Sequence, residues 1–415
     1  MLGDGIIAPL LPVAVSLIGG IVAGSHVAVG ERLSLLVLSL LLVVSSLLFR
    51  WPRVQTAAIC LCTLVLGILL ATREMQHLQL TQRPPSSFEV RRATVADQQR
   101  PTLFNRSRQR MLRKRDQLAE RYLRAGLSDD GFSIVAAMTL GDKSVLSRDL
   151  KETYSITGAS HVLALSGLHL GIIYWLITLL TVGRRWRIVS QVVTILAIWA
   201  FAFLTGLSTS IVRSATMLTV YGLMAVGYRQ GASVNVLAFT AIVMLVVSPL
   251  AVYDVSFQLS FLAVLAILLF HPLFFQLVPL PWLQAHPVVK WLWGMTTLSL
   301  AAQIGVAPLI AYYFHRFSVW FLLANFIVIP CAYLILVGGL LLLLTSLPLM
   351  AVALAKVASL MNGALAALSA LPLSSIDGLH PTVVQTVLVY VIIGCGYVVL
   401  SKCIPPLLLH RRLRV

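Results

Sequence analysis

The sequence has very little charge for its length. Of its 415 residues, 11% are charged and 59% are hydrophobic, and its mean hydropathy is +0.93. So few polar residues cannot cover the surface of a water-soluble protein of this size. The composition therefore excludes a soluble globular protein and predicts a membrane protein.

Motifs for metals and nucleotides are also missing. The nine histidines are never two positions apart, and neither an HxH nor an HExxH zinc motif occurs. The GDKS at Gly141–Ser144 ends like a phosphate-binding loop but lacks the glycine five residues upstream. We therefore expect no metal, no cofactor and no motor of its own. The cysteines lie in apolar runs and are interpreted as small hydrophobic residues: Cys60, Cys62, Cys331, Cys395 and Cys403.

Long apolar runs fill most of the chain. Most are about 18 residues or longer, enough to cross a bilayer as a helix that satisfies its own backbone hydrogen bonds. We predict an all-α polytopic membrane protein with about twelve transmembrane helices, in a range of about 10–13. Pro330 interrupts one run, which leaves a tilted helix and a re-entrant segment both open. The predicted spans are 6–24, 33–49, 54–71, 161–182, 187–205, 211–228, 233–251, 255–277, 288–314, 318–347, 349–371 and 382–403.

The charge that is present is mostly basic. The chain has 31 Lys and Arg against 14 Asp and Glu, a net charge of +17. Because basic loops stay in the cytoplasm, we predict that both termini are cytoplasmic. An excess of this size also suits an anionic partner such as phospholipid or nucleic acid. The residues that set the predicted orientation are Arg50, Arg53, Arg184, Arg185, Arg187, Arg229, Arg411, Arg412 and Arg414.

Three segments follow from this pattern. Residues 1–71 form an N-terminal three-helix membrane segment, 72–130 an extracytoplasmic basic segment, and 131–415 a second, larger membrane domain. The basic segment contains a predicted amphipathic helix, Arg106–Leu127, near the membrane surface. Six basic residues at the start of this helix are suited to phosphate binding: Arg106, Arg108, Arg110, Arg113, Lys114 and Arg115.

Polar side chains recur in clusters within the later apolar runs, where hydrocarbon makes polar groups costly. The first cluster, GASHVLALSGLHLG from Gly158 to Gly171, places Ser166 and His169 three residues apart on one predicted helix face. The recurrence favours a lined polar path over passive packing. The residues predicted to line or shape it are His161, Ser166, His169, Arg213, Asp254, Gln258, Gln303 and Asn325.

Simpler interpretations exist for most of these residues. Ser166 and His169 can bond to neighbouring helices across a small-residue packing face. Arg213 can extend toward the membrane interface, and Asp254 can cap the helix that follows it. Gln258 is harder to explain in this way, because its amide needs a partner or water at membrane depth.

The clusters also resemble successive motifs of the membrane domain of the ComEC competence family. GDKSVLSRDLKETYSITGASHVLALSGLHLG, TGLSTSIVRSATM, YDVSFQLSFLAVLAI and QIGVAPLIAYYFHRFS with LLANFIVIP occur in the family's order. APLLPVAVSLIGGIVAG resembles the family's opening span. Many members carry an OB-like domain where this chain has residues 72–130, and a metallo-β-lactamase-like nuclease after the last span. This sequence has at most a reduced form of the first, and it ends at RRLRV.

The resemblance implies a non-enzymatic inner-membrane channel, with 131–415 as its channel domain, that passes single-stranded DNA to the cytoplasm during natural transformation. Its expected partners are membrane lipid, a cytoplasmic ATP-dependent helicase-like motor, an extracytoplasmic DNA receptor and a separate nuclease, and an oligomer is left open. A secondary transporter of a small organic anion is the alternative, since its broken helices and midplane polar groups give a similar pattern. A membrane-embedded hydrolase using Ser166 and His169 is less favoured because no orienting carboxylate is near in sequence.

Overall fold

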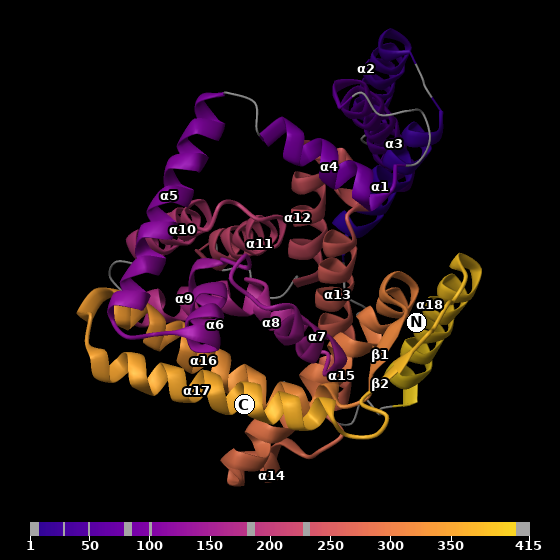
Figure 1. Cartoon of the computed structure of the whole chain (residues 1–415). Coiled ribbons are helices and arrows are strands. Elements are labelled where there is room, and N and C mark those ends of the chain that lie inside the picture. Colours follow the sequence, from indigo (N-terminus) through magenta and orange to yellow (C-terminus); the bar gives the residue numbers. More distant parts are fainter. Residues whose placement is uncertain are drawn as a thin grey trace. The chain divides into compact units, whose positions relative to one another are not determined.

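The computed structural model describes residues 8–27, 30–48, 50–78, 85–98, 102–180, 187–226 and 233–403, which are almost entirely helical (Figure 1). This confirms the predicted all-α polytopic class. Within the described residues, six helices are long and apolar enough to cross a membrane: α3 (Pro52–His77), α13 (Val255–Phe275), α15 (Pro287–Phe314), α16 (Phe321–Thr345), α17 (Pro348–Ser369) and α18 (Val383–Cys403).

Every predicted span overlaps a described helix, and the span at 161–182 overlaps two α-helices. Four shorter apolar helices are α1 (Leu10–His26), α9 (Gly167–Leu180), α10 (Arg187–Leu204) and α12 (Ser233–Val247). Two more spans coincide with α2 (Glu31–Leu47) and α11 (Thr209–Val226). How many of these helices cross the bilayer stays a prediction. The other described elements are α4 (Ser87–Gln98), α5 (Leu103–Arg124), α6 (Asp129–Leu140), α7 (Arg148–Ile156), α8 (Ser160–Leu163), η2 (Pro249–Tyr253), α14 (Leu280–Ala285), β1 (Arg316–Ser318) and β2 (Ser375–Asp377).

The chain forms two compact units. Unit 1 comprises Met1–Gln109, Leu180–Trp199 and Val212–Phe261, and unit 2 comprises Arg110–Leu179, Ala200–Ile211 and Leu262–Val415. These units are defined by packing, which joins segments that are distant in sequence, and the predicted division at 71 and 130 stays a prediction. The predicted orientation stays a prediction, because most of the basic residues on which it depends lie outside the described residues. These are Arg184, Arg185, Arg229, Arg411, Arg412 and Arg414.

In unit 1, glycines bring α1 and α3 into backbone contact. A Cβ added at Gly20 would lie 2.0 Å from the carbonyl oxygen of Leu64, and one at Gly67 would lie 2.5 Å from that of Leu17. Helices in a membrane lack a strong hydrophobic drive to associate, so close van der Waals packing through small residues is their main attraction. Leu17 and Ile21 are fully buried beside this contact.

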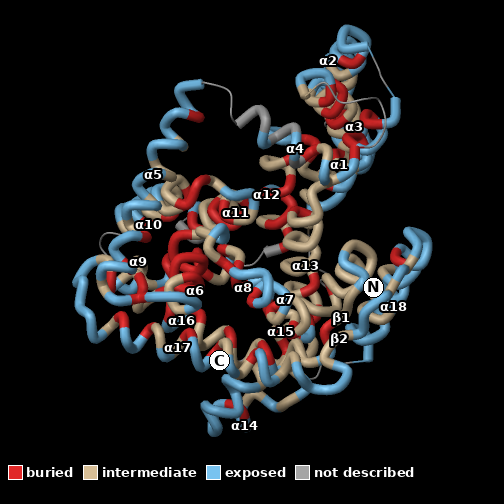
Figure 2. The backbone as a smooth tube through the Cα atoms, in the orientation of Figure 1, coloured by how far each residue is buried: buried red, intermediate tan, exposed pale blue. Residues whose placement is uncertain are grey.

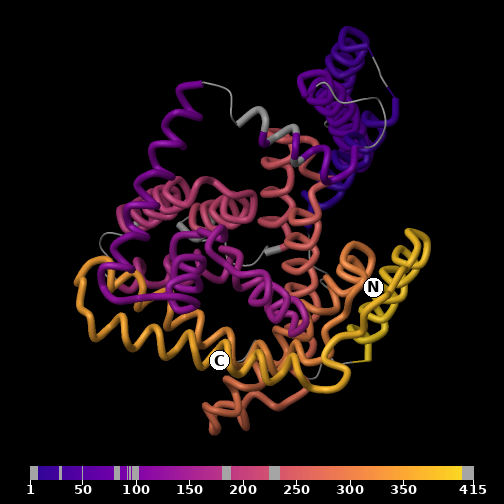
Figure 3. Tube along the Cα trace, in the orientation of Figure 1, coloured from indigo at the N-terminus to yellow at the C-terminus, as the bar shows by residue number. Residues whose placement is uncertain are grey.

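In unit 2, α6 is the buried central helix (Figure 2). Figure 3 shows it beside α16 and α17, which lie about 200 residues later in the chain. The hydroxyl of Tyr122, on α5, lies 3.1 Å from the carbonyl oxygen of Gly339 and 3.0 Å from Thr139 Oγ1, so its one proton is shared between two acceptors. These bonds satisfy a phenol that is completely buried.

The predicted basic helix is confirmed as α5, with bounds shifted by three residues. Its apolar face includes Ala119 and Tyr122, which are buried in the core of unit 2. This core contact, rather than the membrane surface, covers the carboxyl-terminal part of that face.

Two details of the predicted spans are resolved by the backbone. Helix α16 continues through Pro330, which excludes the re-entrant alternative for this segment. The span predicted at 161–182 is interrupted, because 164–166 is not helical between α8 and α9. Ser166 and His169 therefore do not share a helix face as predicted, since Ser166 comes just before the first residue of α9.

Candidate functional site

A buried arginine is the central feature of unit 1. Arg213 lies in the second turn of α11 and is only 2% exposed. Its Nη2 donates to Ser256 Oγ at 3.0 Å. Among the described residues, its Nε and Nη1 have no hydrogen-bond partner. The side chain therefore does not extend to an interface, and it holds a buried positive charge with unused donors, which favours an anion as its partner.

The turn before α13 positions the partner of this arginine. Asp254 precedes the helix, and its Oδ1 accepts the backbone N–H of Ser256 at 2.9 Å. Asp254 is thus a helix cap, as its simpler interpretation predicted. Gln258 Nε2 donates to the carbonyl oxygen of Val252 at 2.8 Å, so this amide finds a partner in the backbone of η2. The structure thus brings Arg213 near Asp254, through its bond to Ser256 two residues later, and gives Gln258 a separate partner.

Ser256 is the residue that sequence reasoning missed here. It follows the capping Asp254 by two positions and precedes Gln258 by two, inside the predicted YDVSFQLS cluster. Its hydroxyl accepts from Arg213, 43 residues away in the chain. No local sequence pattern predicts a contact between these two residues. The position of Ser256 within a polar cluster could still have marked it as a candidate site residue.

In unit 2, the interruption between α8 and α9 is held by Ser166 and His169. The backbone N–H of Ser166 donates to His169 Nδ1 at 3.2 Å, and Ser166 Oγ lies 3.1 Å from the same nitrogen. The bond from the Ser166 N–H is one half of a capping box, with histidine in place of the usual Glu or Gln at the third helical position. Because Nδ1 accepts the backbone N–H, the ring proton of neutral His169 is on Nε2.

The same histidine has an unused donor. His169 is fully buried, and its Nε2 has no hydrogen-bond partner among the described residues. A serine hydrolase would need a group there to orient the ring. The geometry therefore explains Ser166 and His169 as a helix cap that also presents one buried N–H donor.

His161 is near enough to His169 for an electrostatic interaction, but His161 and Asn325 make their hydrogen bonds elsewhere. His161 is exposed, and its Nδ1 lies 3.1 Å from the carbonyl oxygen of Gly158. Asn325, on α16, donates from Nδ2 to Ser299 Oγ on α15 at 3.2 Å, while its Oδ1 is buried without a partner among the described residues. Gln303 is half-buried one turn after Ser299 on α15.

The six basic residues of α5 differ in how freely they can bind phosphate. Arg115 contacts Asp116 at 2.7 Å and Asp142 at 3.8 Å, so its charge is already neutralised. Arg108 is half-buried. The other four are exposed along one end of the helix: Arg106, Arg110, Arg113 and Lys114.

Comparison with known proteins decides the family. The model of the Competence protein family matches residues 138–403, well over half of the chain. The chain belongs to the Competence protein family. This confirms the resemblance to the ComEC competence family. All eight predicted path residues lie within the matched range, and the basic residues of α5 lie before it.

Several relatives match about half of this chain. The chain is 29% identical over 208 residues to ComE operon protein 3 of Bacillus subtilis, covering 49% of this chain and 25% of that protein. It is 26% identical over 225 residues to Recombination protein 2 of Haemophilus influenzae, covering 51% and 28%. An uncharacterized protein of Aquifex aeolicus is 31% identical over 204 residues, covering 48% and 44%. The matches thus span less than half of each relative, and no solved structure matches this chain.

Proposed function

We propose that this protein conducts single-stranded DNA across the cytoplasmic membrane during competence. The observation that carries the proposal is Arg213, a buried arginine with two unused donors in a competence-family membrane domain. A guanidinium group is suited to phosphate because its planar donors match phosphate oxygens. The buried N–H of His169 and the buried carbonyl of Asn325 add polar groups in the other unit.

The energetics of import require a partner. A strand entering an inside-negative cell works against about 2.3 kcal/mol per charge per 100 mV. We find no nucleotide-binding motif in this sequence that would supply that energy. A cytoplasmic ATP-dependent motor therefore belongs to the proposal, together with an extracytoplasmic receptor that delivers DNA and a separate nuclease that leaves one strand.

The direct test uses the purified chain in lipid vesicles. An inside-positive potential replaces the motor, since it pulls a polyanion inward. We expect labelled single-stranded oligonucleotides to enter the vesicles, and duplexes of the same length to stay outside. Vesicles without protein are the control. Uptake of small organic anions without uptake of DNA would instead support the transporter alternative.

The exposed cations of α5 are proposed to capture the strand before it enters. Because each neutralised phosphate releases counterions, replacing Arg106 and Arg110 by glutamine should weaken binding at low salt. The slope of log affinity against log salt should fall by about 1.4. Fluorescence anisotropy with a labelled oligothymidine measures this slope.

A matched control lies on the same helix. Arg121→Gln with Arg124→Gln removes the same charge from the other end of α5, where Arg124 already contacts Glu120 at 3.4 Å. We expect the slope to be almost unchanged in this variant. Equal slopes for both double variants would refute a capture site at residues 106–114.

A further inference from the structure

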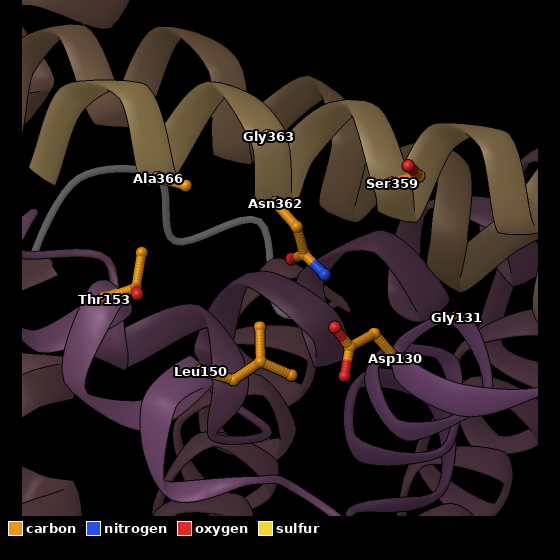
Figure 4. A pocket seen from close by; sticks show the side chains of 8 residues that line it. All are labelled: Asp130, Gly131, Leu150, Thr153, Ser359, Asn362, Gly363 and Ala366. Carbon is orange, nitrogen blue, oxygen red and sulfur yellow. The ribbon is translucent and has the colours of Figure 1, made fainter. Parts of the chain in front are cut away.

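Unit 2 contains a cavity outside the groups described above. Its volume is about 350 Å³. It lies between α17 on one side and the first turn of α6 together with α7 on the other (Figure 4). The lining residues are Asp130, Gly131, Leu150, Thr153, Ser359, Asn362, Gly363 and Ala366. None of the predicted path residues belongs to this set.

A buried tyrosine orients the amide of this cavity. Tyr154 is completely buried, and its hydroxyl donates to Asn362 Oδ1 at 2.9 Å. Because the amide oxygen is held by this bond, the Nδ2 group points into the cavity toward Asp130 (Figure 4). A side chain fixed in this way donates in a defined direction.

A carboxylate faces the amide from the opposite wall. Asp130 lies in the first turn of α6, and its side chain points toward Asn362 (Figure 4). An ionised carboxylate accepts two parallel N–H bonds, whereas the Asn362 amide donates. The cavity therefore presents a pair of acceptors beside a donor.

The rest of the cavity is suited to a flat ring. Gly131, Gly363 and Ala366 add no bulky side chain to the walls, and Leu150 supplies an apolar surface. The cavity is open to solvent on one side, because four of its lining residues are exposed: Asp130, Ser359, Gly363 and Ala366. A planar heterocycle can place one face against Leu150 and use its edge for hydrogen bonds. The volume of about 350 Å³ exceeds what a single metal ion or water molecule requires.

Only one DNA base has the complementary edge. Guanine carries two adjacent donors, N1–H and the 2-amino group, next to the O6 acceptor. Thymine has one donor between two carbonyls, and cytosine and adenine each have an acceptor ring nitrogen where guanine has N1–H. Unpaired bases in single strands expose these edges for side chains to read.

We infer that an unpaired guanine base binds in this cavity, with Asp130 accepting from N1–H and the 2-amino group and Asn362 donating to O6. The inference rests on the proposed function, because the transported strand supplies the base. A free guanine nucleotide has the same edge, and the experiment separates the two sources. Binding of this kind would make the strand pause at its guanines during transport. This pause would not depend on Arg213.

The test measures equilibrium binding to the full chain in detergent micelles. The probes are a labelled oligothymidine and the same strand with one central guanine, xanthine or hypoxanthine, which lacks the 2-amino group. Free dGMP is the separate nucleotide probe. We expect the guanine strand to bind about tenfold more tightly than the all-thymine strand. Hypoxanthine should lose most of this preference.

Two variants with the same charge change locate the site. Asp130→Asn should abolish the preference for guanine and create one for xanthine, whose 2-carbonyl accepts from the new amide. Asp129→Asn, at the adjacent position, should keep the guanine preference, because Asp129 is exposed like Asp130 but does not line the cavity. The gain of xanthine binding shows that Asp130→Asn is folded, so loss of guanine binding cannot be attributed to unfolding.

Several results would overturn the inference. These are equal affinity of the unmodified protein for guanine and thymine strands, equal losses in Asp129→Asn and Asp130→Asn, and binding of dGMP without a guanine preference in the strand. The outcome is independent of the vesicle test. Failure of the guanine site leaves oligothymidine binding and import intact, whereas failure of import leaves the binding preference measurable.

Discussion

Replacing Arg213 by methionine is expected to reduce import of single-stranded DNA into vesicles by about tenfold to a hundredfold. Two donors of this guanidinium are free of protein partners among the described residues. A hydrogen bond to a charged group contributes about 1.5–3 kcal/mol, so the expected reduction corresponds to the loss of one such bond to the strand. The same change should leave thermal stability unchanged or raise it. A buried charge without full pairing destabilises the fold, and an apolar side chain of similar length removes that cost.

Import is expected to fall while thermal stability stays the same or rises, and this combination makes the prediction specific. A merely structural arginine would lose stability and import together. Arg148→Met, at an exposed position at the start of α7, is the control and should change neither measurement. Import that stays at the original rate in a folded Arg213→Met protein would remove Arg213 from the path. Thermal unfolding in detergent and vesicle import are measured on the same preparation.

Replacing Gly20 by alanine is expected to destabilise unit 1 by about 3 kcal/mol or more. The added Cβ would lie 2.0 Å from the carbonyl oxygen of Leu64, which belongs to the α3 backbone and cannot rotate away. Helices α1 and α3 would have to separate, and their close contact would be lost. Thermal unfolding followed by intrinsic fluorescence or light scattering measures the change.

Gly19 provides a matched control in the same turn of α1. A Cβ at Gly19 meets nothing within 4 Å. Gly19→Ala should therefore be neutral or stabilise the helix by up to about 1 kcal/mol, because alanine is the better helix former. Equal melting temperatures for the two variants would show that α1 does not pack on α3 through Gly20.

The polar residues of the candidate site show where sequence reasoning succeeds and where it stops. The presence of Arg213, Asp254 and Gln258 in apolar runs was visible in the sequence, and the structure gives two of them local roles. Asp254 caps α13 and Gln258 bonds to the preceding turn. Both contacts span six residues or fewer, so local rules predict them well. The partner of Arg213 is Ser256, and no local rule predicts a contact 43 residues away.

The interruption before α9 illustrates a second limit. Hydropathy predicted one continuous span at 161–182, because apolar residues on either side mask a break of three residues. Ser166 and His169 have the spacing of a capping box, S-x-x-H, but His takes the place of the usual Glu or Gln. Recognising that histidine Nδ1 accepts a backbone N–H would have moved the helix start to Gly167.

The sequence by itself determined that this is an all-α membrane protein of the competence type, with a basic helix and recurrent polar clusters. Hydropathy, helical period and motif order are properties of neighbouring residues, so they are readable before folding. Only the tertiary structure decided that α5 buries Tyr122 against Gly339, that Gly20 touches the α3 backbone, and that Asp130 faces Asn362. These contacts join residues that are distant along the chain, and close packing rather than local preference selects them.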